Sequence, residues 1–333
     1  MRAAFVAAAV ALLAAGASAA AENGFAPIVV TARAIPTFGR HGEAASAGTL
    51  EYRGGLELKS SDPRFGSLSG LDVAADGHTL YAVADTGFWF KAEFTETGGR
   101  LTGIGNAELA PILDKAGNVV VSKRLGDAEG LRLTTYRGKP AALVSFEQVN
   151  NVRRFVADPD FAGTPSEVLK LPAMVSGMPP NKGLEAIAVA PEASPLKGAI
   201  VLIAEHSLDA GRGRAWIVGG PLAGAFFVSR KGDFDFTDAV FLENGDMLIL
   251  ERRFNFSEGV GMRIRRIAGT DLKPGATVDG QTLIEADLRD EIDNMEGLAV
   301  TKGENGEWLL LVVSDDNQSI LQRTLLLQFA LKD

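Results

Sequence analysis

The chain has 333 residues, of which 46% are hydrophobic and 23% charged, with 38 glycines and no cysteine. This composition is typical of a folded globular protein, and it excludes disulfides, Cys-ligated metals and a thiol nucleophile. The formal net charge of −9 argues against a nucleic-acid partner, because binding to a phosphate backbone requires a clustered basic surface.

Residues 1–21 predict a cleaved secretory signal peptide. Arg2 precedes an apolar stretch over residues 3–15, and the small residues Ala17-Ser18-Ala19 place a cleavage site near Ala19–Ala21. The apolar stretch is shorter than the ~20 residues that a transmembrane helix needs. We therefore expect a periplasmic or secreted protein with no membrane span in the mature chain, and we expect a monomer.

The remaining chain divides into a lead-in and one β-rich domain. Residues 22–49 contain Pro27 and Pro36 and lack clear periodicity, so they predict an extended lead-in. From Leu50 onward the apolar runs are short and rich in β-forming residues, and no long helical period is present. Residues 50–333 are therefore expected to form an all-β domain.

A β-hairpin unit recurs five times along this domain. The clearest copy runs from Asn294 to Asn317, where two apolar runs flank Asn305-Gly306, a pair suited to a tight hairpin turn. Carboxylates stand at both ends of the unit. Equivalent markers are separated by 60, 56, 53 and 58 residues. The markers are Gly70, Gly130, Ala186, Ala239 and Gly297.

This spacing predicts a single-domain β-propeller with five blades. A repeat of about 57 residues holds four strands and their turns, which is the content of one blade. Residues Leu50–Leu58 would complete the blade that the C-terminal residues begin, and so close the ring. Six blades is the alternative, if Phe88–Val121 contains a degenerate blade.

The repeat also predicts where the carboxylates gather. In an antiparallel hairpin, the residue before the first strand and the residue after the second lie at the same end. If each hairpin is the inner pair of a blade, these ends meet at one mouth of the central channel. The expected cluster is Asp85, Glu129, Glu147, Glu185, Glu205, Asp238, Glu251, Glu296, Asp315 and Asp316.

Clustered carboxylates raise one another's pKa, so a compensating cation is expected. Ca²⁺ prefers such oxygen ligands, and Asn317 would add an amide oxygen. Lys182, Arg252 and Arg253 stand beside repeat carboxylates and are candidates to bind a small anionic substrate. Catalytic candidates are Glu129, Glu185, Glu296 and, as a proton shuttle, His206. The alternative is that the acidic residues cap turns as a shared structural device.

Several segments resemble the family described as esterase-like activity of phytase, or phytase-like. They are Asp127–Leu131, Asn181–Ala188, Asn294–Ala299, Val313–Asn317 and Leu321–Leu326, within a match over about Gly66–Lys332. The resemblance implies a secreted bacterial β-propeller-like protein and suggests phosphate-ester hydrolysis. It marks Glu129, Glu185, Glu296, Asp315, Asp316 and Asn317 as family-defining residues. The sequence departs from the family pattern at Gln318 and Ala186.

The leading hypothesis from the sequence is a periplasmic, calcium-dependent hydrolase of a phosphate ester. Two alternatives stay open. The first is a non-catalytic propeller that binds a ligand or a partner protein, since no recognisable pair of nucleophile and base is present. The second is a carboxylic-ester or lactone hydrolase that uses a metal-bound water in the channel.

Overall fold

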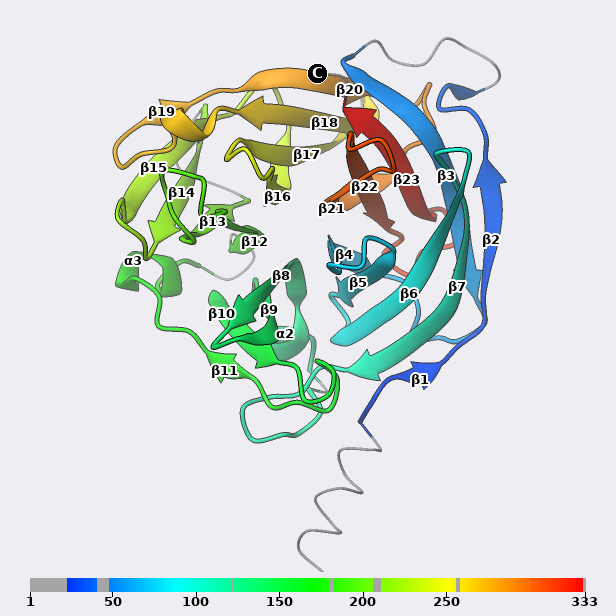
Figure 1. The fold of residues 1–333 in the computed structure, drawn as a ribbon, viewed down its shortest axis with the longest axis horizontal. Helices are drawn as coiled ribbons and strands as arrows, with labels where there is room; N and C mark the ends of the chain where they lie inside the picture. Colours follow the sequence, from blue (N-terminus) through cyan, green and yellow to red (C-terminus); the bar gives the residue numbers. More distant parts are fainter. Residues whose placement is uncertain are drawn as a thin grey trace, which may run out of the picture.

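The computed structural model describes residues 23–40, 48–120, 122–179, 183–205, 211–255 and 258–331. Its strands form five sheets arranged as blades around a central axis (Figure 1). The predicted all-β propeller with five blades is confirmed. Residues 88–97 and 100–111 are outer strands of the first blade and do not form a sixth. The predicted signal peptide lies outside the described residues.

Each blade begins with an inner strand and continues outward. The first blade contains β4 (Leu68–Val73), β5 (Thr79–Ala84), β6 (Phe88–Thr97), β7 (Arg100–Pro111) and β1 (Ala26–Pro27). The second contains β8 (Ala128–Tyr136), β9 (Lys139–Phe146), β10 (Asn151–Val156) and β11 (Glu167–Val168). The third contains β12 (Leu184–Val189), β13 (Ile200–Ala204), β14 (Arg212–Val218), β15 (Gly224–Ser229) and β19 (Thr277–Val278).

The last two blades complete the ring. The fourth contains β16 (Asp235–Phe241), β17 (Met247–Asn255), β18 (Gly259–Ile267) and β20 (Gln281–Ala286). The fifth contains β21 (Asn294–Lys302), β22 (Trp308–Asp315), β23 (Thr324–Leu331), β3 (Leu50–Ser60) and β2 (Val30–Ile35). Every predicted hairpin is thus the inner pair of a blade.

The fifth blade joins the two ends of the domain. β3 pairs antiparallel with β23, so that Leu56 lies opposite Leu326, as the sequence predicts. The lead-in contributes more than an extended segment, since β2 forms the outer edge of this blade and β1 the outer edge of the first (Figure 1). Backbone hydrogen bonds therefore hold the ring closed.

The hydrophobic core lies between the blades. Five clusters of buried side chains occur, and each combines residues of two neighbouring blades. On β12, Ala186 and Ala188 pack toward the fourth blade while Ile187 packs toward the second. Both faces of an inner strand are buried, which explains why these strands read as continuous apolar runs without polar alternation.

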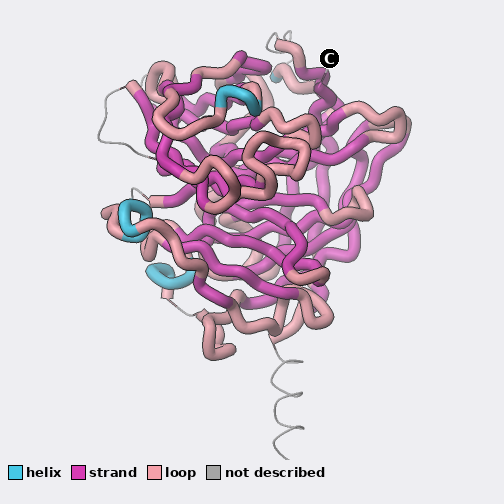
Figure 2. The backbone as a smooth tube through the Cα atoms, turned by 60° about the vertical axis from the view of Figure 1, so that its left-hand side comes forward, coloured by secondary structure: helices cyan, strands magenta, loops and turns pink. Residues whose placement is uncertain are grey.

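Helix is scarce in the described part of the chain, where it is limited to single turns (Figure 2). These are α2 (Lys123–Gly126), α3 (Ala173–Ser176) and the 3-10 turn η2 (Gly269–Asp271). None of the described helices has the length and hydropathy of a membrane-spanning segment. α2 directly precedes β8. Its first residue, Lys123, lies at the same end of the blades as the acidic cluster.

Neighbouring inner strands approach closely near the start of each strand. A Cβ atom added at Gly70 would lie 2.5 Å from the backbone nitrogen of Leu131 and 2.7 Å from the carbonyl oxygen of Glu129. Both atoms belong to the backbone of the next blade and cannot rotate away. The close approach of the first and second blades therefore requires glycine at position 70.

We expect Gly70→Ala to lower the free energy of unfolding by about 1–3 kcal/mol, the usual cost of overpacking. Gly105→Ala is the matched control, because a Cβ at that strand position meets no atom within 4 Å. Urea unfolding of the two variants checks this. Equal stabilities would contradict the proposed close packing of the inner strands.

Candidate functional site

Every inner strand carries a β-bulge near its start, where its pairing with the second strand shifts. A bulge re-aims the extra residue away from the ladder. Each inner strand makes one or two pairs with the second strand before the shift, and we call the next residue of the inner strand the bulge position. It is occupied by Ser69, Glu129, Glu185, Thr237 and Glu296.

The second strand supplies a neighbouring residue at the same end. On the second strand, one residue pairs with the inner strand just before the bulge. We call the residue that follows it the strand-end position. It is occupied by Asp85, Glu147, Glu205, Arg252 and Asp315. The two positions therefore carry carboxylates in most blades and place them around the axis.

All of these side chains except Thr237 line one cavity of about 1080 Å³ at the mouth of the propeller. Among the described residues, ten carboxylates face it, against four basic side chains. The carboxylates are Asp85, Asp127, Glu129, Glu147, Glu185, Glu205, Glu291, Asp293, Glu296 and Asp315, and the basic residues are Arg40, Lys123, Arg252 and Arg323. The predicted convergence of the repeat carboxylates is thus present for most of its members.

The fourth blade departs from the acidic pattern and supplies a cation. Arg252 occupies its strand-end position, with Thr237 at its bulge position. The Nε atom of Arg252 lies 2.9 Å from Oε1 of Glu296, and its Nη2 atom lies 3.4 Å from Oε1 of Glu205. Arg252 therefore forms ion pairs with both neighbouring blades, and these carboxylates hold its pKa above the ordinary value.

Lys123 provides a second compensating charge from α2. Its Nζ atom donates to Oδ2 of Asp85 over 2.8 Å and lies 3.8 Å from Oδ1 of Asp127. At the rim, Nη1 of Arg323 donates to Glu291 over 2.7 Å, and Arg40 lies 3.6 Å from the same carboxylate. Each described basic side chain of the cavity thus forms an ion pair with a carboxylate.

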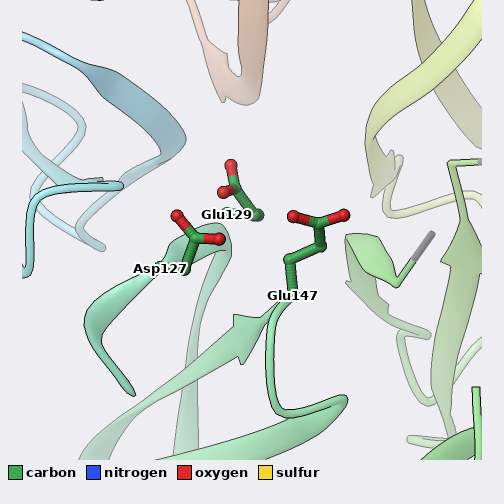
Figure 3. A group of neighbouring side chains, drawn as sticks. All are labelled: Asp127, Glu129 and Glu147. Carbon is green, nitrogen blue, oxygen red and sulfur yellow. The ribbon is translucent and has the colours of Figure 1, made fainter. Parts of the chain in front are cut away.

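Five carboxylates of the cavity lie close to one another, and we call them its floor: Asp127, Glu129, Glu147, Glu185 and Glu205. Asp127, Glu129 and Glu147 place one oxygen each within 4.8 Å of one another, and Figure 3 shows their carboxylates turned toward a common space. Glu147, Glu185 and Glu205 form a second group by the same measure. Glu147 belongs to both groups, so the two candidate cation positions adjoin.

Glu185 is the most confined of these side chains. It is only 9% exposed, and its carboxylate lies beside those of Glu147 and Glu205. Burial, and then repulsion from Glu129, raise its pKa well above the ordinary value. A carboxylate buried among like charges is costly, so its position favours either a bound proton or a bound cation.

The other carboxylates are shifted in the same direction. Burial raises the pKa of Glu147 to about 7, that of Asp315 to about 7 and that of Glu296 to about 8. Repulsion from Asp127 adds to the shift of Glu147, whereas Arg252 opposes that of Glu296. The carboxyl of Glu129 faces water in the cavity but is otherwise enclosed by protein, and burial raises its pKa as well.

The structure corrects the repeat alignment in the fourth blade by one residue. The sequence matched Ala239 to Gly297, but the bulge makes Asp238 the equivalent of Gly297. Because side chains alternate between faces of a strand, this slip moves Asp238 and Glu251 away from the cavity. Neither lines it.

Both of these acidic residues have structural partners. Asp238 is buried in the channel, where Nη2 of Arg132 and the backbone nitrogen of Leu298 donate to it over 2.7 and 2.8 Å. Glu251 is fully buried inside the fourth blade and accepts hydrogen bonds from Arg263 and Arg265. These pairs connect strands and leave no oxygen for a ligand in the cavity.

Two further predicted residues have structural partners away from the floor. Asp316 holds a loop, since the backbone nitrogen of Ser67 and the hydroxyl of Thr324 donate to it over 3.0 and 2.8 Å. Arg253 pairs with Glu258 at 2.6 Å and lies outside the main cavity. Asn317 does line the cavity. Lys182 and His206 lie outside the described residues.

The sequence reasoning missed residues that reach the cavity from outside the two repeat positions. Asp127 precedes Glu129 by two residues and is the structural equivalent of Asn294, so the repeat held a signal for it. Lys123, Arg40 and Arg323 come from a short helix and from loops. No repeat or motif marks those residues, and their role follows from the fold alone.

A family model described as "Phytase-like: Esterase-like activity of phytase" matches residues 63–318. The chain belongs to this family. The match covers all five bulge positions and all five strand-end positions, so the family's shared segment contains the acidic floor of the cavity. The resemblance predicted from the sequence motifs is thereby confirmed.

No curated protein sequence matches this phytase-like chain. Among solved structures, an endo-1,4-beta-xylanase from Bacteroides thetaiotaomicron is similar at 8% identity and TM-score 0.46, covering 79% of this chain and 90% of that one. U3-55K is similar at 10% identity and TM-score 0.37, covering 82% and 74%. The N-terminal domain of Nup159 is similar at 9% identity and TM-score 0.36, covering 81% and 78%.

The raised pKa values predict how the metal-free protein responds to pH. The folded state keeps protons on Glu147, Glu296 and Asp315 up to pH 7–8, whereas the unfolded chain releases them near pH 4. The unfolded state therefore binds fewer protons in this window, and stability falls as pH rises. We expect the Tm of EDTA-treated protein to drop by about 5 °C or more between pH 5 and pH 8.

The control is the double variant Glu147→Gln/Glu296→Gln, whose Tm should depend less on pH over the same range. A wild-type Tm that rises from pH 5 to pH 8 in EDTA would show that the cavity carboxylates are not strained by their mutual repulsion.

Proposed function

We propose that this protein is a calcium-dependent hydrolase of phosphate esters, acting in the acidic cavity. The observation that carries the proposal is the pair of carboxylate groups that share Glu147 on the cavity floor. Membership of the phytase-like family supports hydrolase-like chemistry.

The residues present fit calcium. The donor set consists of carboxylates, with the amide of Asn317 at the same cavity, and Ca²⁺ prefers several oxygen ligands of this kind. Glu185, buried beside Glu147 and Glu205, is a further sign that a positive charge belongs there. We assign Asp127, Glu129, Glu147, Glu185 and Glu205 as the residues that would hold the cation.

Bound calcium would neutralise the floor, attract a phosphate group and polarise it toward attack by water. In the reaction, a water oxygen bonds to phosphorus, the bond from phosphorus to the alcohol oxygen breaks, and the alcohol leaves with a proton. Glu296 and Asp315 stand outside both carboxylate groups and face the same cavity. With pKa values raised to about 8 and about 7, they are suited to take up and return protons near neutral pH.

Arg252 has a positioning role in this scheme. It holds Glu296 through the 2.9 Å ion pair and prevents the carboxylate from swinging into the cation groups. The same guanidinium lies 3.4 Å from Glu205 of the floor, so we also assign it contact with substrate oxygen. Lys182 and His206 keep the roles that the sequence suggests, substrate binding and proton transfer, as part of this proposal.

The predicted leader extends the proposal to location. A chain exported to the periplasm or the exterior works where calcium is abundant, which suits carboxylate sites of moderate affinity. We propose that the mature protein acts there as a monomer.

Turnover of a phosphate monoester by the purified protein tests the function. We expect activity with added Ca²⁺ and a loss of at least ~100-fold in EGTA, because the floor would then repel the substrate. Glu147→Gln should lose activity comparably, since it removes the carboxylate common to both groups. Glu304→Gln, at an exposed turn outside the cavity, is the matched control and should retain full activity.

Hydrolysis that survives EGTA at the full rate would overturn the calcium requirement. Turnover of carboxylic esters or lactones, with none of phosphate esters, would identify the other hydrolase. Calcium binding without turnover of either class would leave a binding propeller.

A further inference from the structure

One side of the acidic cavity is a wall of apolar side chains. Phe254, Val260, Leu288, Ile292 and Leu321 line it, all from the fourth and fifth blades or their connections. Phe254 and Val260 lie opposite each other on β17 and β18. We call these five residues the apolar wall.

The outer part of this wall is unusually exposed. Phe254 is 64% exposed, Leu288 49% and Leu321 87%. Ile292 belongs to the hydrophobic core between the fourth and fifth blades, and Val260 packs against that core. Exposed apolar side chains that border a polar cavity mark a ligand-binding surface more often than single scattered ones do.

The basic side chains of the cavity offer little to a polyanion. Each described basic side chain of the cavity already has a carboxylate partner: Lys123 with Asp85, Arg252 with Glu296, and Arg323 and Arg40 with Glu291. One phosphate group could be held by a cation on the floor. Several phosphates on one molecule would meet the remaining carboxylates of the cavity and be repelled.

We propose that the natural substrate class is a phosphate monoester of an apolar alcohol, whose alkyl or aryl part lies against the apolar wall. This inference rests on the proposed function and specifies its substrate. Hydrolysis converts R–O–PO₃²⁻ and water into R–OH and HPO₄²⁻. The phosphate lies over the carboxylate floor and the alcohol part extends toward Phe254 and Leu321.

Binding of alkyl phosphonates to the calcium-loaded protein tests the inference without requiring turnover. Calorimetry with methylphosphonate and hexylphosphonate compares ligands that share one head group. We expect hexylphosphonate to bind at least ~10-fold more tightly, the usual scale for filling an apolar pocket. Phe254→Ser and Leu321→Ser should each remove most of this preference and leave methylphosphonate binding unchanged.

Leu222→Ser is the matched control, because Leu222 is an exposed leucine in a loop outside the cavity. Equal affinity for the two phosphonates, or a preference of the wild-type protein for inositol hexakisphosphate over both, would overturn the inference.

Kinetics with methyl and hexyl phosphate separate this inference from the proposed function, since the two esters have leaving groups of similar basicity. A chain-length preference in binding without hydrolysis of either ester would reject the hydrolase and keep the ligand class. Hydrolysis of both at equal kcat/KM, with equal binding, would keep the hydrolase and reject the apolar wall as its specificity element.

Discussion

The structure depends on how like charges are held together at the mouth of the propeller. A β-bulge at the start of each inner strand re-aims one side chain, which reaches the cavity in every blade but the fourth, and the second strand adds another beside it. Repetition of this arrangement around the axis brings carboxylates within reach of one another.

The fourth blade makes this concentration of charge tolerable. It carries Thr237 and Arg252 where the other blades carry mostly acidic residues, and Arg252 pairs with the blade on either side. The repeated positions therefore supply the negative charge of the site, and Arg252, where the fourth blade departs from the repeat, neutralises part of it. The floor carboxylates crowd together between Lys123 and Arg252, with Glu185 buried among them, and they define the proposed cation position.

Much of the fold could be predicted because its signals are local. Paired apolar runs with turns such as Asn305-Gly306 mark the hairpins, and their even spacing sets five blades closed by Leu50–Leu58. The register of the fourth blade could not be predicted, since a one-residue slip at a bulge leaves the apolar pattern almost unchanged yet reverses where Asp238 and Glu251 point. The contributions of Lys123, Arg40 and Arg323 depend on loop paths that no periodicity encodes.

The central claim is that the carboxylates of the floor form a cation site. Anomalous diffraction from a crystal soaked with Ca²⁺ tests it most directly, because it locates the ion without reference to activity. The account predicts a peak in the space enclosed by Glu129, Glu147 and Glu185, bound by carboxylate oxygens at about 2.3–2.6 Å. A well-ordered cavity with no peak there, at a calcium concentration in the millimolar range, would contradict it.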